Sequence, residues 1–171
     1  AAIVRASTAA SRSRSEAMSK IDHTTAPTGS GSRYPAPYDA PCQARRWLKL
    51  GEAAGLTQFG VNLLTLPSGA WSSQRHWHEH EDEFVQVISG KVVLVTDAGE
   101  KLLRAGDSAG FKAGTRDGHH LQNRSGNDAV LLVVGSRNDA DWGEYPDIDL
   151  KYGPGRYSGP LPYLHKDGTP Y

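Results

Sequence analysis

The chain has 171 residues, 37% of them hydrophobic and 22% charged, which is typical of a globular protein and not of a disordered one. Its 19 basic residues balance its 19 acidic residues, so no net positive charge is present to attract nucleic acid. The single cysteine, Cys42, excludes an internal disulfide and a cysteine-based zinc site. Because no apolar run is long enough to span a bilayer, we expect a soluble, cytoplasmic protein that binds neither nucleic acid nor membrane.

The N-terminal part of the chain is expected to contain little regular structure. Residues 1–33 begin with an acid-poor stretch of Ala, Ser and Arg that lacks the apolar core of a secretory signal. We expect a disordered leader or tag-like segment here, with Met18 as the natural start, although the composition also resembles an organelle transit peptide. Residues 34–58 continue a proline- and glycine-rich stretch and are expected to form an extended arm, with one helical turn near Leu50–Leu56.

Residues 59–136 contain short apolar segments that alternate with turn residues. The expected strands are 59–66, 71–78, 84–88, 91–96, 101–104, 108–111, 119–123 and 129–134. Ser89 and Gly90 form a two-residue signal for a hairpin between the third and fourth of these strands. Many short strands without a helical period indicate an all-β sandwich or barrel.

The C-terminal part, residues 137–171, is rich in turn residues but also in tyrosine, leucine and tryptophan. This composition is too apolar for a solvated tail. We therefore expect an extension that packs on the barrel.

Five of the seven histidines lie between His76 and His120. His76 and His78 are two residues apart, so on a strand their imidazoles face the same side and can bind one metal ion. A nearby carboxylate could join them, and Glu79, Glu81, Asp82 and Glu83 are the candidates. We favour Glu83 because it begins an apolar strand, whereas the other three lie in a turn. His80 has the same parity but would join only if the strand continued that far.

A second pair of histidines, His119 and His120, lies near the start of a later strand. Later strands of an antiparallel barrel cross the same interior, so one of these imidazoles could complete a set of three histidines and one carboxylate. The residues themselves leave open which of the two it is. The alternative interpretation of both clusters is exposed polar sequence in solvated loops.

The spacing of these residues resembles the two motifs of the cupin superfamily. The positions that match the first motif are Gly69, His76, His78, Glu83 and Gly90. The positions that match the second motif are Gly106, Gly114, His119 and Asn123. The resemblance covers residues 59–134.

The chain departs from the family pattern at three places. Six residues rather than five separate Gly69 from His76, and Lys112 replaces a proline. Four residues rather than two separate Gly114 from His119. Because Asn123 follows His119 by four positions, as in the family, the resemblance favours His119 over His120 as the last ligand.

The resemblance implies a double-stranded β-helix, or jelly-roll, barrel at residues 59–136, with extended N- and C-terminal arms and assembly as a homodimer. It also implies one divalent metal ion held by His76, His78, Glu83 and His119. Iron, manganese, zinc and nickel all suit such ligands. Enzymes with this fold act on small molecules by dioxygenase, isomerase or lyase chemistry, and the alternative is a non-catalytic module that binds or senses a small ligand.

Other side chains are candidates for roles around this site. Gln74 shares the parity of His76 and is expected to line the pocket, and Gln86 is a candidate ligand contact on its strand. Arg75 and Arg116 could bind an anionic substrate, although exposure is the commoner fate of arginine. Trp77 lies between two inward-facing histidines and is expected to point out of the barrel.

Overall fold

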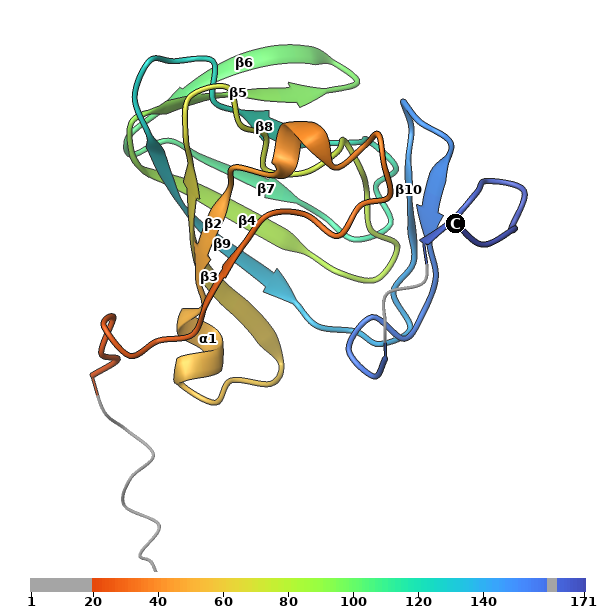
Figure 1. Ribbon diagram of the computed structural model, residues 1–171, viewed down its shortest axis with the longest axis horizontal. Helices are drawn as coiled ribbons and strands as arrows, with labels where there is room; N and C mark the ends of the chain where they lie inside the picture. The colour runs from red at the N-terminus through yellow and green to blue at the C-terminus, as the bar shows by residue number, and fades with distance from the viewer. Residues whose placement is uncertain (1–19, 160–162) are drawn as a thin grey trace, which may run out of the picture.

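The computed structural model describes residues 20–159 and 163–171 of the chain (Figure 1). Its strands are β1 (Thr28–Ser30), β2 (Arg46–Leu48), β3 (Phe59–Leu66), β4 (Glu83–Ser89), β5 (Lys91–Thr96), β6 (Gly99–Arg104), β7 (Ser108–Phe111), β8 (His120–Gln122), β9 (Ala129–Ser136), β10 (Gly143–Tyr145), β11 (Leu150–Tyr152) and β12 (Tyr163–Leu164). The helical elements are a 3₁₀ turn at Ala40–Cys42 and α1 (Leu50–Ala53), the helical turn that the sequence predicted. The prediction of an all-β fold is confirmed.

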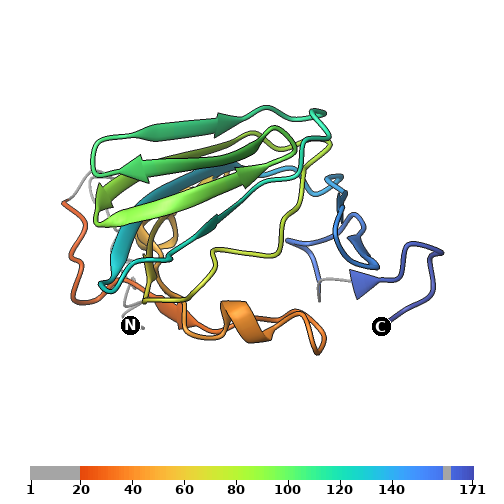
Figure 2. The same ribbon diagram turned by 90° about the horizontal axis from the view of Figure 1, so that it is seen from above.

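Two antiparallel sheets enclose the main core. The larger has the strand order β1-β2-β3-β9-β4-β7, and the smaller has the order β6-β5-β8. In Figure 2, β5 and β6 lie on one face of the molecule and the N-terminal segment (orange) runs along the opposite face. The core residues come from both sheets: Leu64, Leu66, Ala70, Val85, Val87, Val92, Leu94, Leu121, Ala129 and Leu131. Burial of these side chains provides the hydrophobic driving force that closes the two sheets on each other.

The N-terminal segment takes part in the larger sheet. Strand β1 pairs with β2, and β2 pairs with β3. The prediction of a disordered leader is therefore wrong for residues 28–30, while its residues 1–19 lie outside the described part of the chain. The arm at 34–58 is likewise not extended throughout, because β2 and α1 lie within it.

The prediction of a strand at 71–78 is wrong. This segment forms only two isolated bridges, between Trp71 and Gln122 and between His76 and His119. Its backbone N–H groups donate to separate segments: Trp71 to the Pro41 carbonyl (2.9 Å), His76 to the His119 carbonyl (3.2 Å) and Trp77 to the Glu144 carbonyl (3.3 Å). The backbone hydrogen bonds of the described residues include none donated by 73–75, so no continuous ladder forms between the two bridges.

The hairpin predicted at Ser89-Gly90 is also wrong. Strand β4 pairs with β7 on one side and β9 on the other, so it has no free edge for β5. Gly90 instead carries the chain from the larger sheet to the smaller one, with φ +79°. A Cβ at this position would lie 2.8 Å from the Asp128 carbonyl oxygen, so the crossing requires glycine.

The C-terminal extension forms a third small sheet in the order β10-β11-β12, on one side of the barrel in Figure 1. Its buried residues Tyr145, Leu150 and Tyr152 pack with Tyr34 and Tyr38 of the N-terminal arm. The two arms therefore meet in a second apolar cluster beside the barrel. No helix among the described residues is long and apolar enough to cross a membrane.

We predict that Cys42 is unreactive in the native protein. Its side chain is fully buried, and burial raises the pKa of the thiol from 9.0 to about 11, which lowers the thiolate fraction at pH 8 about 100-fold. Alkylation of Cys42 by iodoacetamide at pH 8 should be at least about 100-fold slower in buffer than in about 6 M guanidinium chloride. Equal rates in the two solutions would contradict the buried position of this residue.

Candidate metal centre

Three side chains that are far apart in the sequence meet between the two sheets. One nitrogen each of His76 and His119 and one carboxylate oxygen of Glu83 lie within 4.8 Å of one another. His76 and His119 are adjacent because their backbones form a bridge, with N–H···O distances of 3.2 and 2.9 Å. Glu83 begins β4 and shares the inward-facing parity of the core residues Val85 and Val87.

His78 joins this group from the same irregular segment as His76. Its Nε2 lies 3.8 Å from Oε2 of Glu83, and its ring centroid lies 4.9 Å from that of His76. The structure thus brings together the four side chains that the sequence singled out: two from one loop, one from β4 and one from the residue before β8. We call His76, His78, Glu83 and His119 the histidine–glutamate cluster.

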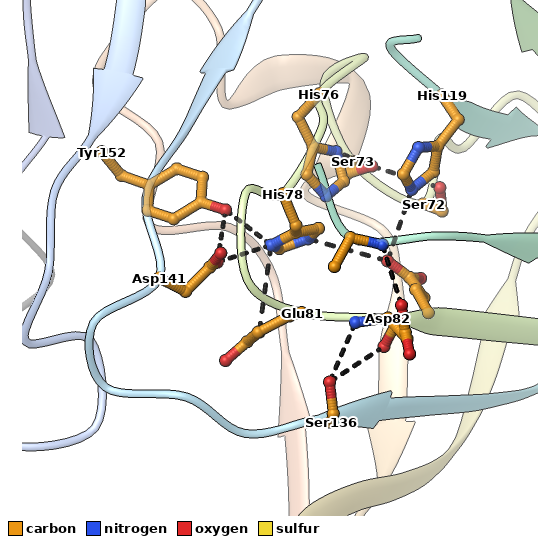
Figure 3. A network of polar contacts seen from close by, with 12 residues as sticks. Ser72, Ser73, His76, His78, Glu81, Asp82, His119, Ser136, Asp141 and Tyr152 are labelled. Carbon is orange, nitrogen blue, oxygen red and sulfur yellow. Dashed lines mark hydrogen bonds and ion pairs between the residues drawn. The ribbon is translucent and has the colours of Figure 1, made fainter. Parts of the chain in front are cut away.

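A buried carboxylate that the sequence did not predict holds His78. Nδ1 of His78 lies 2.7 Å from Oδ2 of Asp141, which is fully buried. The other oxygen of Asp141 accepts the N–H of His80 (2.8 Å), and the Tyr152 hydroxyl donates to Oδ2 (2.8 Å). Figure 3 shows His78 with Asp141 and Tyr152 on one side and with His76 and His119 on the other. Asp141 lies in a turn-rich segment without distinctive spacing, so nothing in the sequence pointed to it.

The hydrogen bonds define which nitrogen of two imidazoles is free to bind a metal. Nδ1 of His76 donates to the Gln74 carbonyl (2.9 Å), and Nδ1 of His78 donates to Asp141. In the neutral form of each ring, Nε2 is then the nitrogen without a proton. This is the usual arrangement of metal-binding histidines, in which the second nitrogen is held by a carbonyl or a carboxylate.

The charge state of the cluster also fits metal ligands. Burial, together with the neighbouring His78 and His119, lowers the pKa of His76 well below its usual value. Burial alone raises the pKa of Glu83, but the hydrogen bond and charge of His119 outweigh it and bring this pKa to about 2. Near neutral pH, the cluster therefore combines an uncharged imidazole at His76 with an ionised carboxylate at Glu83.

His119 is poorly satisfied by protein groups. Its Nδ1 is buried and has no hydrogen-bond partner among the described residues, and its Nε2 lies 3.4 Å from Glu83. Its ring is stacked on Phe111 at a centroid distance of 3.6 Å. Nε2 is the nitrogen that faces Glu83, so it is the atom that would bind a cation, whereas the unpartnered Nδ1 is the other nitrogen of the ring. Three imidazole nitrogens with one carboxylate suit a divalent transition metal.

A second set of possible ligands, which includes two carboxylates, does not compete for such an ion. His78, Glu81 and Asp141 also bring their ligand atoms close together. Arg156, however, places NH1 3.1 Å from Glu81 and 3.6 Å from Asp141. This guanidinium already places one positive charge beside both buried carboxylates.

The cluster faces a cavity of about 630 Å³ between the barrel and the two arms. His76, His78 and Glu83 line it from the barrel, and Tyr145 and Tyr152 line it from the C-terminal extension. His119 is not part of this wall and instead lines a smaller cavity of about 220 Å³. A ligand in the larger cavity would therefore reach three of the four cluster residues directly.

His120, the alternative to His119, lies outside the cluster. It is buried, with Nδ1 3.0 Å from the Ser73 carbonyl and Nε2 2.9 Å from the Gln122 amide. Asn123, the motif residue that follows, is also structural, because its amide donates to the Leu66 carbonyl (2.7 Å).

The other acidic candidates are engaged elsewhere. Glu79 pairs with Arg116 at 3.4 Å, Glu81 pairs with Arg156, and the exposed Asp82 accepts the N–H of Ala113. His80 is exposed.

Several predicted lining residues do not reach the cavity. Gln74 donates to the Tyr38 carbonyl (2.6 Å) and so points to the arm. Gln86 faces the side of β4 opposite to Val85, because side chains alternate along a strand. Arg75 is bound by Asp147 and Asp97, so it is not free for an anion.

Arg116 and Trp77 face outward and pack on each other. The guanidinium of Arg116 lies 5.1 Å from the centre of the Trp77 ring, which in turn contacts Trp142. Trp77 does leave the barrel interior as predicted, but it is buried by the C-terminal extension.

Asp141 offers a direct test of the contact to His78. Replacing Asp141 by asparagine keeps the side-chain volume but removes the charge that orients Nδ1–H. Loss of such an outer partner typically lowers metal affinity by about 10- to 100-fold. We expect this loss in a zinc-chelator competition assay, with Asp139→Asn as the control. An unchanged affinity would show that Asp141 does not act on His78.

The family model for the cupin domain matches residues 62–135. A sugar phosphate isomerase from a cupin superfamily, from Silicibacter pomeroyi, is 42% identical, with a TM-score of 0.84 over 90% of this chain and 96% of that chain. No match was found among curated proteins.

Two further solved structures are more distant. A protein provisionally assigned as a sugar phosphate isomerase, from Acidithiobacillus ferrooxidans, is 28% identical, with a TM-score of 0.67 over 75% of this chain and 80% of that chain. A predicted oxalate decarboxylase from Thermotoga maritima is 19% identical, with a TM-score of 0.57 over 70% of this chain and 100% of that chain. At this identity the likeness supports the fold alone. The match to the Silicibacter pomeroyi protein extends over nearly the full length of both chains, and this chain therefore belongs to the cupin superfamily.

Proposed function

We propose that this protein is a metal-dependent isomerase of a phosphorylated sugar, with one divalent ion per chain held by His76, His78, Glu83 and His119. The observation that carries the proposal is the histidine–glutamate cluster at the wall of a cavity of about 630 Å³. A cavity of this size accommodates a sugar phosphate. The 42% identity to a protein described as a sugar phosphate isomerase supports the choice of reaction among those that the fold can host.

The bound ion would act as a Lewis acid on the carbonyl and hydroxyl oxygens of the sugar. The chain's own residues would orient the substrate. Burial raises the pKa of the Tyr145 hydroxyl, so it remains protonated and able to donate a hydrogen bond near neutral pH, whereas the Tyr152 hydroxyl already donates to Asp141. The Tyr145 ring lies 5.7 Å from the His76 ring, which places this residue beside the cluster.

Metal content and isomerisation test this proposal together. The protein, prepared without a histidine tag, should contain about one Fe, Mn, Zn or Ni ion per chain by mass spectrometry. Incubated in D₂O with a panel of aldose and ketose phosphates, it should interconvert at least one pair, which NMR detects. Removal of the ion with a chelator should abolish the reaction, and adding it back should restore it.

Two outcomes would overturn the proposal. If the native protein holds no metal, the Lewis acid that the proposed reaction needs is absent. A metal-loaded protein that binds a sugar phosphate but converts none of the panel would instead be a ligand-binding module of the same fold.

A further inference from the structure

We propose that the cavity holds the phosphate group of its ligand on a positively charged wall formed by Arg45 and Arg137. This inference deepens the proposed function and rests on it for the position of the sugar at the histidine–glutamate cluster. Both arginines line the cavity that His76 and Glu83 also line. Neither was a candidate on sequence grounds.

Arg45 is held in place by groups that leave its charge uncompensated. Its Nε donates to the Gly31 carbonyl (2.8 Å), and one NH₂ group donates to the Ser72 carbonyl. The guanidinium carbon also lies 4.8 Å from the centre of the Trp47 ring and 5.7 Å from that of Tyr34. Carbonyls and rings fix the orientation of the fork but do not neutralise it, and some of its five N–H donors remain free for a ligand.

Arg137, which lines the same cavity, is fixed in a similar way. It follows β9 and donates to the Leu56 carbonyl at 3.1 Å. Its guanidinium carbon lies 5.7 Å from the centre of the Tyr157 ring. Again the partners are a carbonyl and a ring, and no carboxylate of the described residues forms an ion pair with it.

Most other arginines of the described chain have an acidic partner. The paired ones are Arg46, Arg75, Arg116, Arg124 and Arg156. The arginines without an ion pair in residues 20–159 and 163–171 are Arg33, Arg45, Arg104 and Arg137, and all of these except Arg104 line the cavity. Uncompensated guanidinium groups therefore gather where a ligand would bind.

The acidic groups of the cavity do not balance this charge. The carboxylates that line it among the described residues are Glu52, which pairs with Lys49 at 3.1 Å, and Glu83, which lies among the imidazoles. An anionic ligand would supply the missing charge. A phosphate monoester carries a charge of about −1.5 to −2 at pH 7, and its oxygens match the planar fork of arginine.

The test compares a phosphorylated with an unphosphorylated sugar on the metal-loaded protein. Isothermal titration calorimetry should show that fructose 6-phosphate binds the wild-type protein at least about 100-fold more tightly than fructose does. The double variant Arg45→Gln, Arg137→Gln should lose most of this preference without a change in fructose affinity or metal content. Arg46→Gln is the matched control, because Arg46 neighbours Arg45 but pairs with the exposed Asp128 outside the cavity.

Arg45 joins the N-terminal segment at Gly31 to the barrel at Ser72, so the double variant could fail to fold. Arg137→Gln alone loses one hydrogen bond, and it should still weaken fructose 6-phosphate binding about tenfold. A folded double variant that keeps the full preference would overturn the proposal, since the metal alone would then select the phosphate. If Arg137→Gln is the only variant that folds, the proposal is overturned when this variant binds fructose 6-phosphate as tightly as the wild-type protein does.

The proposed function can fail separately. A protein that isomerises sugars but shows no effect of either arginine would refute this subsite alone. A protein that turns over no sugar phosphate, yet loses fructose 6-phosphate binding in the arginine variants, would refute the isomerase alone.

Discussion

Replacement of His78 by alanine is expected to lower the affinity for a divalent metal by about 10²- to 10³-fold. If four ligands share a binding free energy of about 10–16 kcal/mol equally, removal of one loses ~2.5–4 kcal/mol. The same substitution leaves Asp141 and Tyr152 buried without their imidazole partner, so the free energy of unfolding should also fall. Metal content by mass spectrometry and chelator competition with zinc measure the first effect, and urea unfolding measures the second.

The neighbouring histidines provide the controls for this experiment. His80→Ala changes an exposed side chain two positions away and should leave metal content unchanged. His119→Ala should lose the metal, whereas His120→Ala should keep it and only destabilise the fold, because His120 bonds to Ser73 and Gln122. Retention of metal by both His78→Ala and His119→Ala would show that the histidine–glutamate cluster is not the site.

Replacement of Gly143 by alanine is expected to lower the free energy of unfolding by about 3 kcal/mol, at the upper end for an overpacked buried site. A Cβ on this residue of β10 would overlap the Trp77 carbonyl oxygen and lie 2.7 Å from the Tyr152 hydroxyl. The C-terminal extension would have to move away from the loop that carries His76 and His78. Urea unfolding followed by tryptophan fluorescence measures the loss.

Gly153→Ala is the matched control in the same extension, because nothing lies within 4 Å of its added Cβ. It should change the free energy of unfolding by less than about 0.5 kcal/mol. If Gly143→Ala were as stable as Gly153→Ala, the contact between β10 and the histidine loop would not exist in solution.

Local patterns predicted much of the barrel. Alternating apolar residues between turn signals gave the positions of β3, β5 and β7, because a strand with one buried face needs that period. The pair His76 and His78 was chosen by strand alternation and, with Glu83, by motif spacing; the spacing held although 71–78 is not a strand. Spacing also placed Asn123 after His119, and the structure brings His119 rather than His120 beside Glu83.

What the sequence did not predict depends on partners that lie far away along the chain. The segment 71–78 has strand-like composition, but its backbone hydrogen bonds go to three separate places, Pro41, residues 119–121 and Glu144, so it stays irregular. Gly90 marks a sharp change of direction, but only the pairing of β4 with β9 decides that the chain crosses to the other sheet.

The surroundings of the cluster were decided in the same way. Asp141, Arg45 and Arg137 carry no local signal, since an aspartate in a turn and an arginine near a strand are usually exposed. They gain their positions only when the two arms fold back over the barrel and meet in the tyrosine cluster. The sequence by itself determined most of the barrel strands, because strand period acts between neighbours, and its motif spacing picked out the four side chains of the histidine–glutamate cluster. The tertiary structure alone decided the cavity, its charge and the support of His78, because these arise from contacts between segments that are separated by tens of residues.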